Sequence, residues 1–93
     1  MTKRRFASVW DAIEDSAAEA ENMKLRSRLM MAVRDYIERE GLSQAQAAKL
    51  FGVTQPRVSD LTRGKIDLFS IDMLVNMLAA AGLRVDLKIA RPR

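Results

Sequence analysis

Apolar residues recur at helical spacing along most of the chain. They predict amphipathic helices over residues 6–20 and 23–40, and the first of these has an acidic face. The segment Ser43-Gln44-Ala45-Gln46 fits a capping box, in which a serine and a glutamine three residues later satisfy each other's free amides. It predicts a third helix from Ser43 to about Phe51. The chain is therefore expected to be mostly helical.

Two further helices are marked by the residues at their ends. Thr54 can cap a fourth helix, in which Pro56 occupies the first turn, and Gly64 can end it. Ser70 can cap a fifth helix, and Gly82 can end it in a left-handed conformation. The pattern thus predicts five helices before residue 83.

The last apolar pattern has a period of two. Val85, Leu87 and Ile89 alternate with charged residues, which predicts a β-strand over residues 83–89. The sequence offers no second strand, and a strand whose amides are unpaired tends to associate. We expect this strand to pair with its own copy across a two-fold axis and form a homodimer. A solitary extended tail that folds back on the fifth helix is the alternative.

Composition narrows the chemistry. Of the 93 residues, 48% are hydrophobic, which is enough for one core, and the chain has no cysteine and no histidine. Disulfides, thiolate metal sites and catalysis by cysteine or histidine are therefore excluded, and we expect no enzyme activity, metal or cofactor. No apolar run approaches the roughly 20 residues that cross a bilayer, so we expect a cytoplasmic protein without membrane contact.

Charge is distributed unevenly along the chain. The net charge is +4, yet residues 1–22 carry a net −2, whereas residues 42–65 carry +3. A basic segment of this kind favours a partner that bears phosphate groups, although many charged runs are simply solvated surfaces.

The residues around Gly52 match a known motif. The run Gln44-x3-Ala48-x3-Gly52-x5-Val58-x2-Leu61 resembles the helix-turn-helix of the XRE, or lambda-repressor-like, family. A small residue is needed where the second helix crosses the first, a glycine makes the turn, and two apolar residues anchor the second helix. The resemblance implies an all-α, five-helix lambda-repressor-like domain, to which we add the C-terminal β-strand expected to mediate dimerisation.

The chain also resembles one subgroup of this family, the HigA-type antitoxins. The resemblance covers residues 23–87 and includes the phrases Val53-Thr54-Gln55-Pro56-Arg57-Val58-Ser59 and Gly64-Lys65-Ile66-Asp67-Leu68-Phe69-Ser70. It implies a dimer that binds operator DNA, represses its own operon and neutralises a RelE- or HigB-like ribonuclease toxin. A stand-alone, phage-like XRE regulator without a toxin is the main alternative, and a protein-interaction module that has lost DNA binding is another.

The family pattern assigns DNA contacts within the motif. It implies that Gln44 contacts a phosphate and that the early residues of the second helix reach base edges in the major groove. The chemistry fits, because glutamine can pair with adenine and arginine with guanine, whereas basic residues after the helix suit phosphates. The candidate DNA-binding residues are Gln44, Thr54, Gln55, Pro56, Arg57, Ser59, Asp60, Arg63 and Lys65.

Two of these candidates depart from the family pattern. Pro56 can offer only an apolar contact, for instance to a thymine methyl group. Asp60 must accept a hydrogen bond from cytosine or pair with Arg57 or Arg63. For the basic candidates and Ser59, a solvated residue without a DNA contact is the alternative.

The N-terminal helix carries an apolar stripe that includes Phe6, Trp10 and Ile13. We expect this stripe either to pack on the helical bundle or to bind the toxin, since the acidic opposite face suits a basic ribonuclease. If the C-terminal strand forms the dimer, two recognition helices lie about 34 Å apart and the operator is palindromic. The expected regions are an N-terminal amphipathic helix or arm over 1–22, a helix-turn-helix DNA-binding domain over 23–82, and a C-terminal strand and tail over 83–93.

Overall fold

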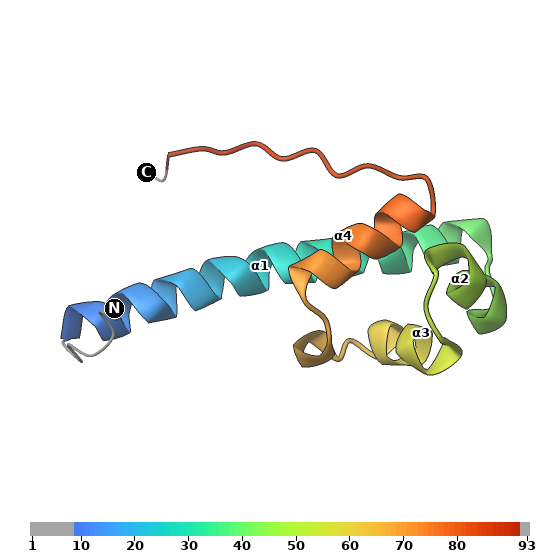
Figure 1. Cartoon of the computed structure of the whole chain (residues 1–93), viewed down its shortest axis with the longest axis horizontal. Helices are drawn as coiled ribbons and strands as arrows, with labels where there is room; N and C mark the ends of the chain where they lie inside the picture. The colour runs from blue at the N-terminus through green and yellow to red at the C-terminus, as the bar shows by residue number, and fades with distance from the viewer. Residues whose placement is uncertain (1–8, 92–93) are drawn as a thin grey trace.

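A computed structural model describes the backbone of residues 9–91 and the side chains of residues 16–91. It contains helices α1 (Val9–Glu40), α2 (Gln44–Phe51), α3 (Gln55–Thr62) and α4 (Ile71–Ala80), with a short 3-10 turn, η2 (Ile66–Leu68), before α4. Helix α4 lies along the C-terminal half of α1, and α2 and α3 lie at that end of the molecule (Figure 1). The described chain is therefore an all-α arrangement of four helices, without a strand.

The prediction of two helices before Gly41 was wrong, because α1 is continuous across the expected break. Its sequence contains neither glycine nor proline, so nothing in the backbone ends the helix near residue 21. Instead, two contacts at helical spacing bridge this region. Lys24 Nζ lies 3.3 Å from a carboxylate oxygen of Glu21, and the Arg26 guanidinium donates to Asn22 Oδ1 at 2.7 and 3.1 Å. The predicted five helices are thus four.

The predicted C-terminal β-strand was also wrong. Residues 83–91 follow α4 as an extended segment that runs back over α1 (Figure 1). The last backbone hydrogen bond joins the Leu83 amide to the Leu78 carbonyl at 2.9 Å, and residues 84–91 make none with the rest of the described chain. A strand exists only as part of a ladder. The alternation of apolar residues correctly indicated an extended segment, but the described chain has no neighbouring strand with which it could pair.

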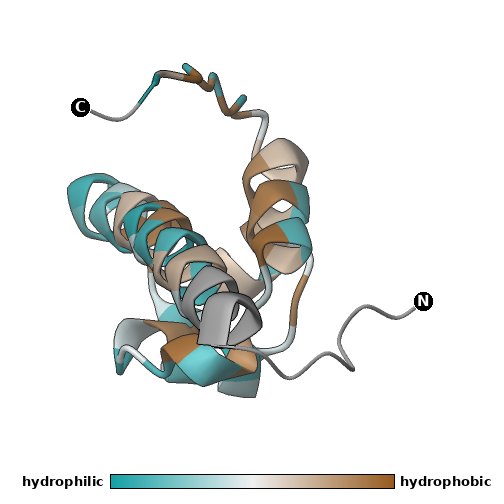
Figure 2. Ribbon diagram, turned by 90° about the vertical axis from the view of Figure 1, so that its left-hand side faces the viewer, coloured by the Kyte–Doolittle hydropathy of each residue, from teal (hydrophilic) through white to brown (hydrophobic). Residues whose placement is uncertain are grey.

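One core lies between the helices. Its buried residues come from every helix and from the segment before α4, and Figure 2 shows that apolar residues dominate α4. All buried side chains among the described residues are apolar. Burial of apolar surface therefore holds the bundle together. The core consists of Leu29, Met30, Val33, Ala47, Ala48, Phe51, Val58, Leu61, Phe69, Leu74, Met77 and Leu78.

The N-terminal half of α1 extends beyond this core. Residues 16–24 are all exposed, and the first buried residue among the described side chains of the helix is Leu29. The molecule is accordingly elongated, with extents of 48 × 28 × 21 Å. We call the described residues 9–24 of α1 the N-terminal arm. It is a helical extension whose side chains along residues 16–24 are all exposed and contribute nothing to the buried core.

Candidate nucleic-acid interface

The start of α2 is fixed by the predicted capping box. Ser43 Oγ accepts from the Gln46 amide at 3.1 Å, and Gln46 Oε1 accepts from the Ser43 amide at 2.9 Å. Both helix-start amides are thereby satisfied, which is worth about 1 kcal/mol for such a cap. Gln44, the predicted phosphate contact, is the first residue of α2 and is exposed.

The turn between α2 and α3 depends on Gly52. Its φ is +70°, and its amide bonds to the carbonyl of Ala48. A Cβ atom at this position would contact only Ala80 Cβ, at an ordinary 3.8 Å, so there is space for a side chain. Glycine is favoured because of the positive φ and not because of crowding. Ala47 and Ala48 are buried where α2 contacts α3. The small residues and the turn glycine predicted for the motif therefore have the expected positions.

Helix α3 is anchored through its inner side. Thr54 Oγ1 accepts from the Arg57 amide at 3.3 Å, and Pro56 is the second helical residue, where no helical hydrogen bond is lost. Val58 and Leu61 are 1% and 0% exposed and hold the helix in the core. The predicted cap and both predicted anchors are confirmed.

The outer side of α3 is set by the helical repeat. Because successive residues are 100° apart, Pro56, Ser59, Asp60 and Arg63 lie opposite the two buried anchors. Pro56 and Arg63 are exposed, and Ser59 and Asp60 are half-buried. Gln55 is exposed at the first turn. The outer side is thus made of short side chains, with a single arginine at its C-terminal end.

Arg57 lies on the flank of α3, between the inner and outer sides. Its guanidinium carbon is 5.5 Å from the centre of the Phe69 ring, and its Nη1 donates to the Leu68 carbonyl at 3.2 Å. The side chain is half-buried. This contact could not be predicted from the sequence, since it joins α3 to residues 11 and 12 positions later, across a turn with no regular period.

A second arginine reaches the same turn from α1. Arg26 Nη1 donates to the Ile66 carbonyl at 3.2 Å, while its other nitrogens bond to Asn22. The Ile66 carbonyl also accepts from the Phe69 amide at 3.2 Å. Arg26 was missed as a functional candidate. The only signal in the sequence was Asn22, four residues before Arg26 at helical spacing, and it does not point to a contact 40 residues away.

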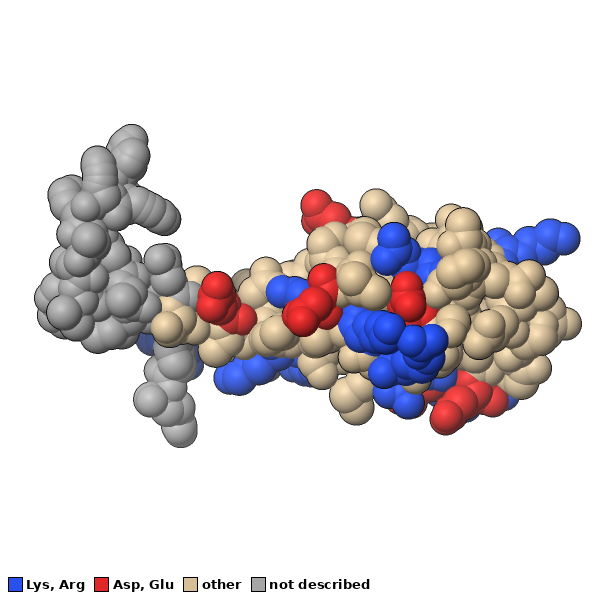
Figure 3. Space-filling view, turned by 90° about the horizontal axis from the view of Figure 1, so that it is seen from below, with Lys and Arg blue, Asp and Glu red and all other residues tan. Residues whose placement is uncertain are grey.

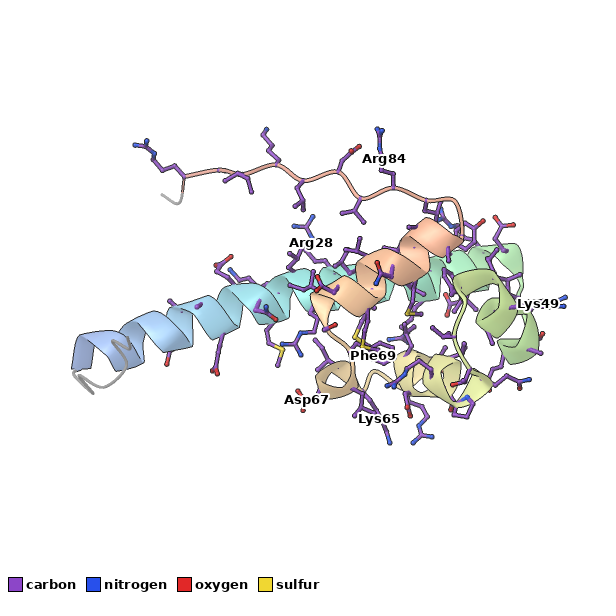
Figure 4. All side chains as sticks on the ribbon, viewed as in Figure 1. Arg28, Lys49, Lys65, Asp67, Phe69 and Arg84 are labelled. Atoms are coloured by element: carbon purple, nitrogen blue, oxygen red, sulfur yellow. The ribbon has the colours of Figure 1, made fainter. Side chains whose placement is uncertain are left out.

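Basic residues surround the C-terminal end of α3. Viewed from the side of α3, Lys and Arg gather in the middle of the surface, with acidic residues around them (Figure 3). Arg63 and Lys65 are exposed, and Lys65 points away from the bundle beneath η2 (Figure 4). Lys49 projects from α2 at the end of the molecule. Such a surface can bind a polyanion through phosphate contacts.

Comparison with known proteins identifies this arrangement. A family model described as a helix-turn-helix domain matches residues 12–90. A solved structure assigned to the XRE family of transcriptional regulators is similar over 80% of this chain and 83% of its own, with a TM-score of 0.72 and 36% sequence identity. The chain belongs to the XRE helix-turn-helix family. No curated protein sequence matches it.

As a member of the XRE family, the protein is a DNA-binding transcriptional regulator. Its family pairs a supporting helix, here α2, with a recognition helix, here α3. Across residues 9–91, no helix is long and apolar enough to cross a membrane, and the described side chains form no acidic cluster able to hold a metal ion.

The remaining candidates of this XRE-family protein lie away from α3. Phe6 is outside the described residues. Trp10 and Ile13 are residues of α1, but their side chains are outside the described part. Leu87 and Ile89, two of the three predicted dimerisation residues, are 65% and 89% exposed. That third residue, Val85, is half-buried against the core.

Proposed function

We propose that this protein represses its own operon by binding a palindromic operator as a homodimer, and that it is the antitoxin of a toxin–antitoxin pair. The observation that carries the DNA-binding part is the outer side of α3, where short exposed or half-buried side chains lead to the exposed basic residues Arg63 and Lys65. This arrangement fits a helix that enters the major groove with cations at the phosphates beside it.

The roles of individual residues follow from their positions. Gln55, Ser59 and Asp60 would meet base edges, and Pro56 would offer an apolar contact. Gln44 and Thr54, at the starts of the two helices, and Arg63 and Lys65, after α3, would contact phosphates. The predicted guanine contact of Arg57 would require its guanidinium to leave Phe69 and the Leu68 carbonyl.

The homodimer is proposed from the exposed end of the chain. Leu87 and Ile89 present apolar side chains on the extended C-terminal segment. Together with Val85 and with Leu25 and Leu29 of α1, they line an open groove between that segment and α1. Contact between copies at this apolar surface would bury it and would bring two recognition helices onto one duplex.

The antitoxin role is proposed from the N-terminal arm. The arm leaves the bundle, so a partner could cover it without touching α3. Glu19 and Glu21 are exposed on it, and residues 1–22 have a net charge of −2. A ribonuclease that binds RNA has a basic surface, which would complement this charge. We propose Phe6, Trp10 and Ile13 as the apolar part of the contact.

Growth and binding assays test these roles separately. The DNA upstream of the gene should shift in a gel with this chain, and binding should weaken steeply as salt rises. The neighbouring gene product, expressed alone, should arrest growth, and co-expression of residues 1–93 should relieve the arrest. Residues 23–93 should retain DNA binding and fail to relieve it.

The outcomes separate the alternatives. DNA binding without a growth-arresting partner would leave a stand-alone, phage-like XRE regulator, which agrees equally well with the solved relative. Relief of arrest without any DNA binding would leave a protein-interaction module. Relief by residues 23–93 would contradict the role proposed for the arm.

A further inference from the structure

We propose that Arg57 is a positioning residue of the DNA-binding surface and not a reader of bases. In this role it holds the η2 turn against α3 through Phe69 and Leu68, and so fixes the backbone that carries Arg63 and Lys65. The inference rests on the proposed binding of an operator by α3.

The position of Arg57 on α3 directs its side chain toward η2 and Phe69. On the helical repeat it lies about 70° from the centre of the buried side of α3 and about 110° from the centre of the outer side. Its own amide is held by Thr54 at the first turn of the helix, so its Cα is fixed. From this position the guanidinium lies over the ring of Phe69, a residue that is 2% exposed.

The contacts of Arg57 give its guanidinium two partners in the free protein. A cation over an aromatic ring is stabilised more strongly when it is partly removed from water, as this half-buried side chain is. The hydrogen bond to the Leu68 carbonyl is charge-assisted. A guanine would have to replace both interactions, whereas Gln55 is exposed and has no such partner to give up.

The turn that Arg57 contacts follows directly after α3. Arg63 and Lys65, the proposed phosphate contacts, lie between α3 and η2. The Gly64 amide bonds to the Leu61 carbonyl at 3.0 Å, and the Lys65 amide bonds to the Asp60 carbonyl at 3.0 Å. These bonds attach the start of the turn to α3. Arg57 attaches its end, at Leu68, to the same helix.

Arg26 holds the turn from the opposite helix. Its hydrogen bond to the Ile66 carbonyl links α1 to the turn at 3.2 Å, and it does not belong to α3. The two arginines therefore donate hydrogen bonds to carbonyl groups two residues apart in the turn, Arg26 from α1 and Arg57 from α3. Because Arg26 cannot read a base from α1 through this contact, its variant shows what loss of positioning alone does to DNA binding.

Selection from a pool of randomised DNA duplexes tests the inference. The variants are Arg57→Ala, Arg57→Lys and Arg26→Ala, with Ser59→Ala as the base-reading comparison. Arg34→Ala is the matched charge control, because Arg34 is exposed on α1 and lies outside both the candidate DNA-binding residues and the groove proposed for dimer contact. Each variant is compared with the wild-type chain in base preference, affinity and salt dependence.

A positioning role predicts one pattern for both arginines. Arg57→Ala and Arg26→Ala should each weaken binding by about 3- to 10-fold for every duplex tested, as expected from loss of about one interaction of this kind. The preferred sequence and the salt dependence should not change. Arg57→Lys should recover most of the affinity, since lysine keeps the charge over the ring. Arg34→Ala should match wild type.

Other patterns would overturn the inference. A loss of discrimination by about 5- to 150-fold at one base pair in Arg57→Ala, absent from Arg26→Ala, would assign Arg57 to base reading. A salt slope reduced by about 0.9 would assign it to a phosphate.

A structural readout separates this inference from the proposed function. If the wild-type chain enriches no duplex, operator binding itself is contradicted. Amide hydrogen exchange of residues 64–69 still reports on Arg57 in that case. Faster exchange in Arg57→Ala, with unchanged exchange in the core of α1, supports its hold on the turn, and unchanged exchange at residues 64–69 contradicts it.

Discussion

Tyr36 of α1 meets Phe51 of α2 edge to face, with ring centres 6.1 Å apart and ring planes at 77°. Phe51 is the last residue of α2 and is 2% exposed, whereas Tyr36 is half-buried. The pair joins the end of the supporting helix to the long helix, and its geometry is one that favours aromatic rings. The contact therefore links the end of α2 to α1.

Loss of the Phe51 ring should therefore be costly. Phe51→Ala should lower the free energy of unfolding by about 3–5 kcal/mol, because it removes a fully buried ring and leaves a cavity. Phe51→Leu should cost less, and Tyr36→Phe, which keeps the ring pair, should be close to wild type. Urea unfolding followed by circular dichroism measures all three. Equal stability of Phe51→Ala and wild type would contradict the packing.

Replacement of the turn glycine should act through the backbone alone. Gly52→Ala should lower the free energy of unfolding by about 1 kcal/mol, because φ is +70° while the added Cβ finds an ordinary contact with Ala80. Gly52→Asn should cost less, since asparagine tolerates the left-handed conformation. If the two variants are equally unstable in thermal melts, crowding and not conformation is the cause.

Proline should distinguish the two halves of α1. Ala18 and Ala32 are both exposed alanines within the helix, but only Ala32 lies beside the buried residues. Ala18→Pro should reduce helical content and leave the cooperative unfolding transition almost unchanged, whereas Ala32→Pro should cost about 3 kcal/mol or more. Circular dichroism with thermal melts gives both quantities. A strongly lowered melting temperature for Ala18→Pro would show that the arm does pack.

Removal of a phosphate contact should appear in the salt dependence of binding. Lys65→Ala should weaken operator binding for all sequences and reduce the slope of log K against log salt by about 0.9. Arg34→Ala, which removes one positive charge from an exposed position of α1 outside the proposed dimer groove, should leave the slope unchanged. Fluorescence anisotropy at several salt concentrations measures the slope. Equal slopes for Lys65→Ala and wild type would remove Lys65 from the interface.

Local signals made much of this fold predictable. Ser43, Gly52, Thr54 and Ser70 act within a few residues of themselves, so their caps and turns could be read directly from the sequence, and the structure confirms them. The buried anchors Val58 and Leu61 followed from the same short spacing.

The errors arose where the outcome depends on something beyond the local pattern. The apolar patterns over residues 6–20 and 23–40 were interpreted as two helices, but without glycine or proline the backbone continues through Glu21 and Asn22. The alternation of Val85 and Leu87 correctly indicated an extended chain, but a β-strand requires a neighbour that this chain does not supply. Within the candidate site, the contact of Arg57 with Phe69 crosses a turn and has no sequence period.

The uneven packing of α1 gives one helix two different stabilities. Amides in the arm, over residues 16–24, are protected only by hydrogen bonds within the helix, whereas those around Val33 can exchange only when the bundle opens. Local fraying of the arm therefore costs far less free energy than global unfolding. A protease can therefore cut the arm whenever it is frayed, at a rate set by the population of the frayed state. The bundle and its recognition helix would remain folded.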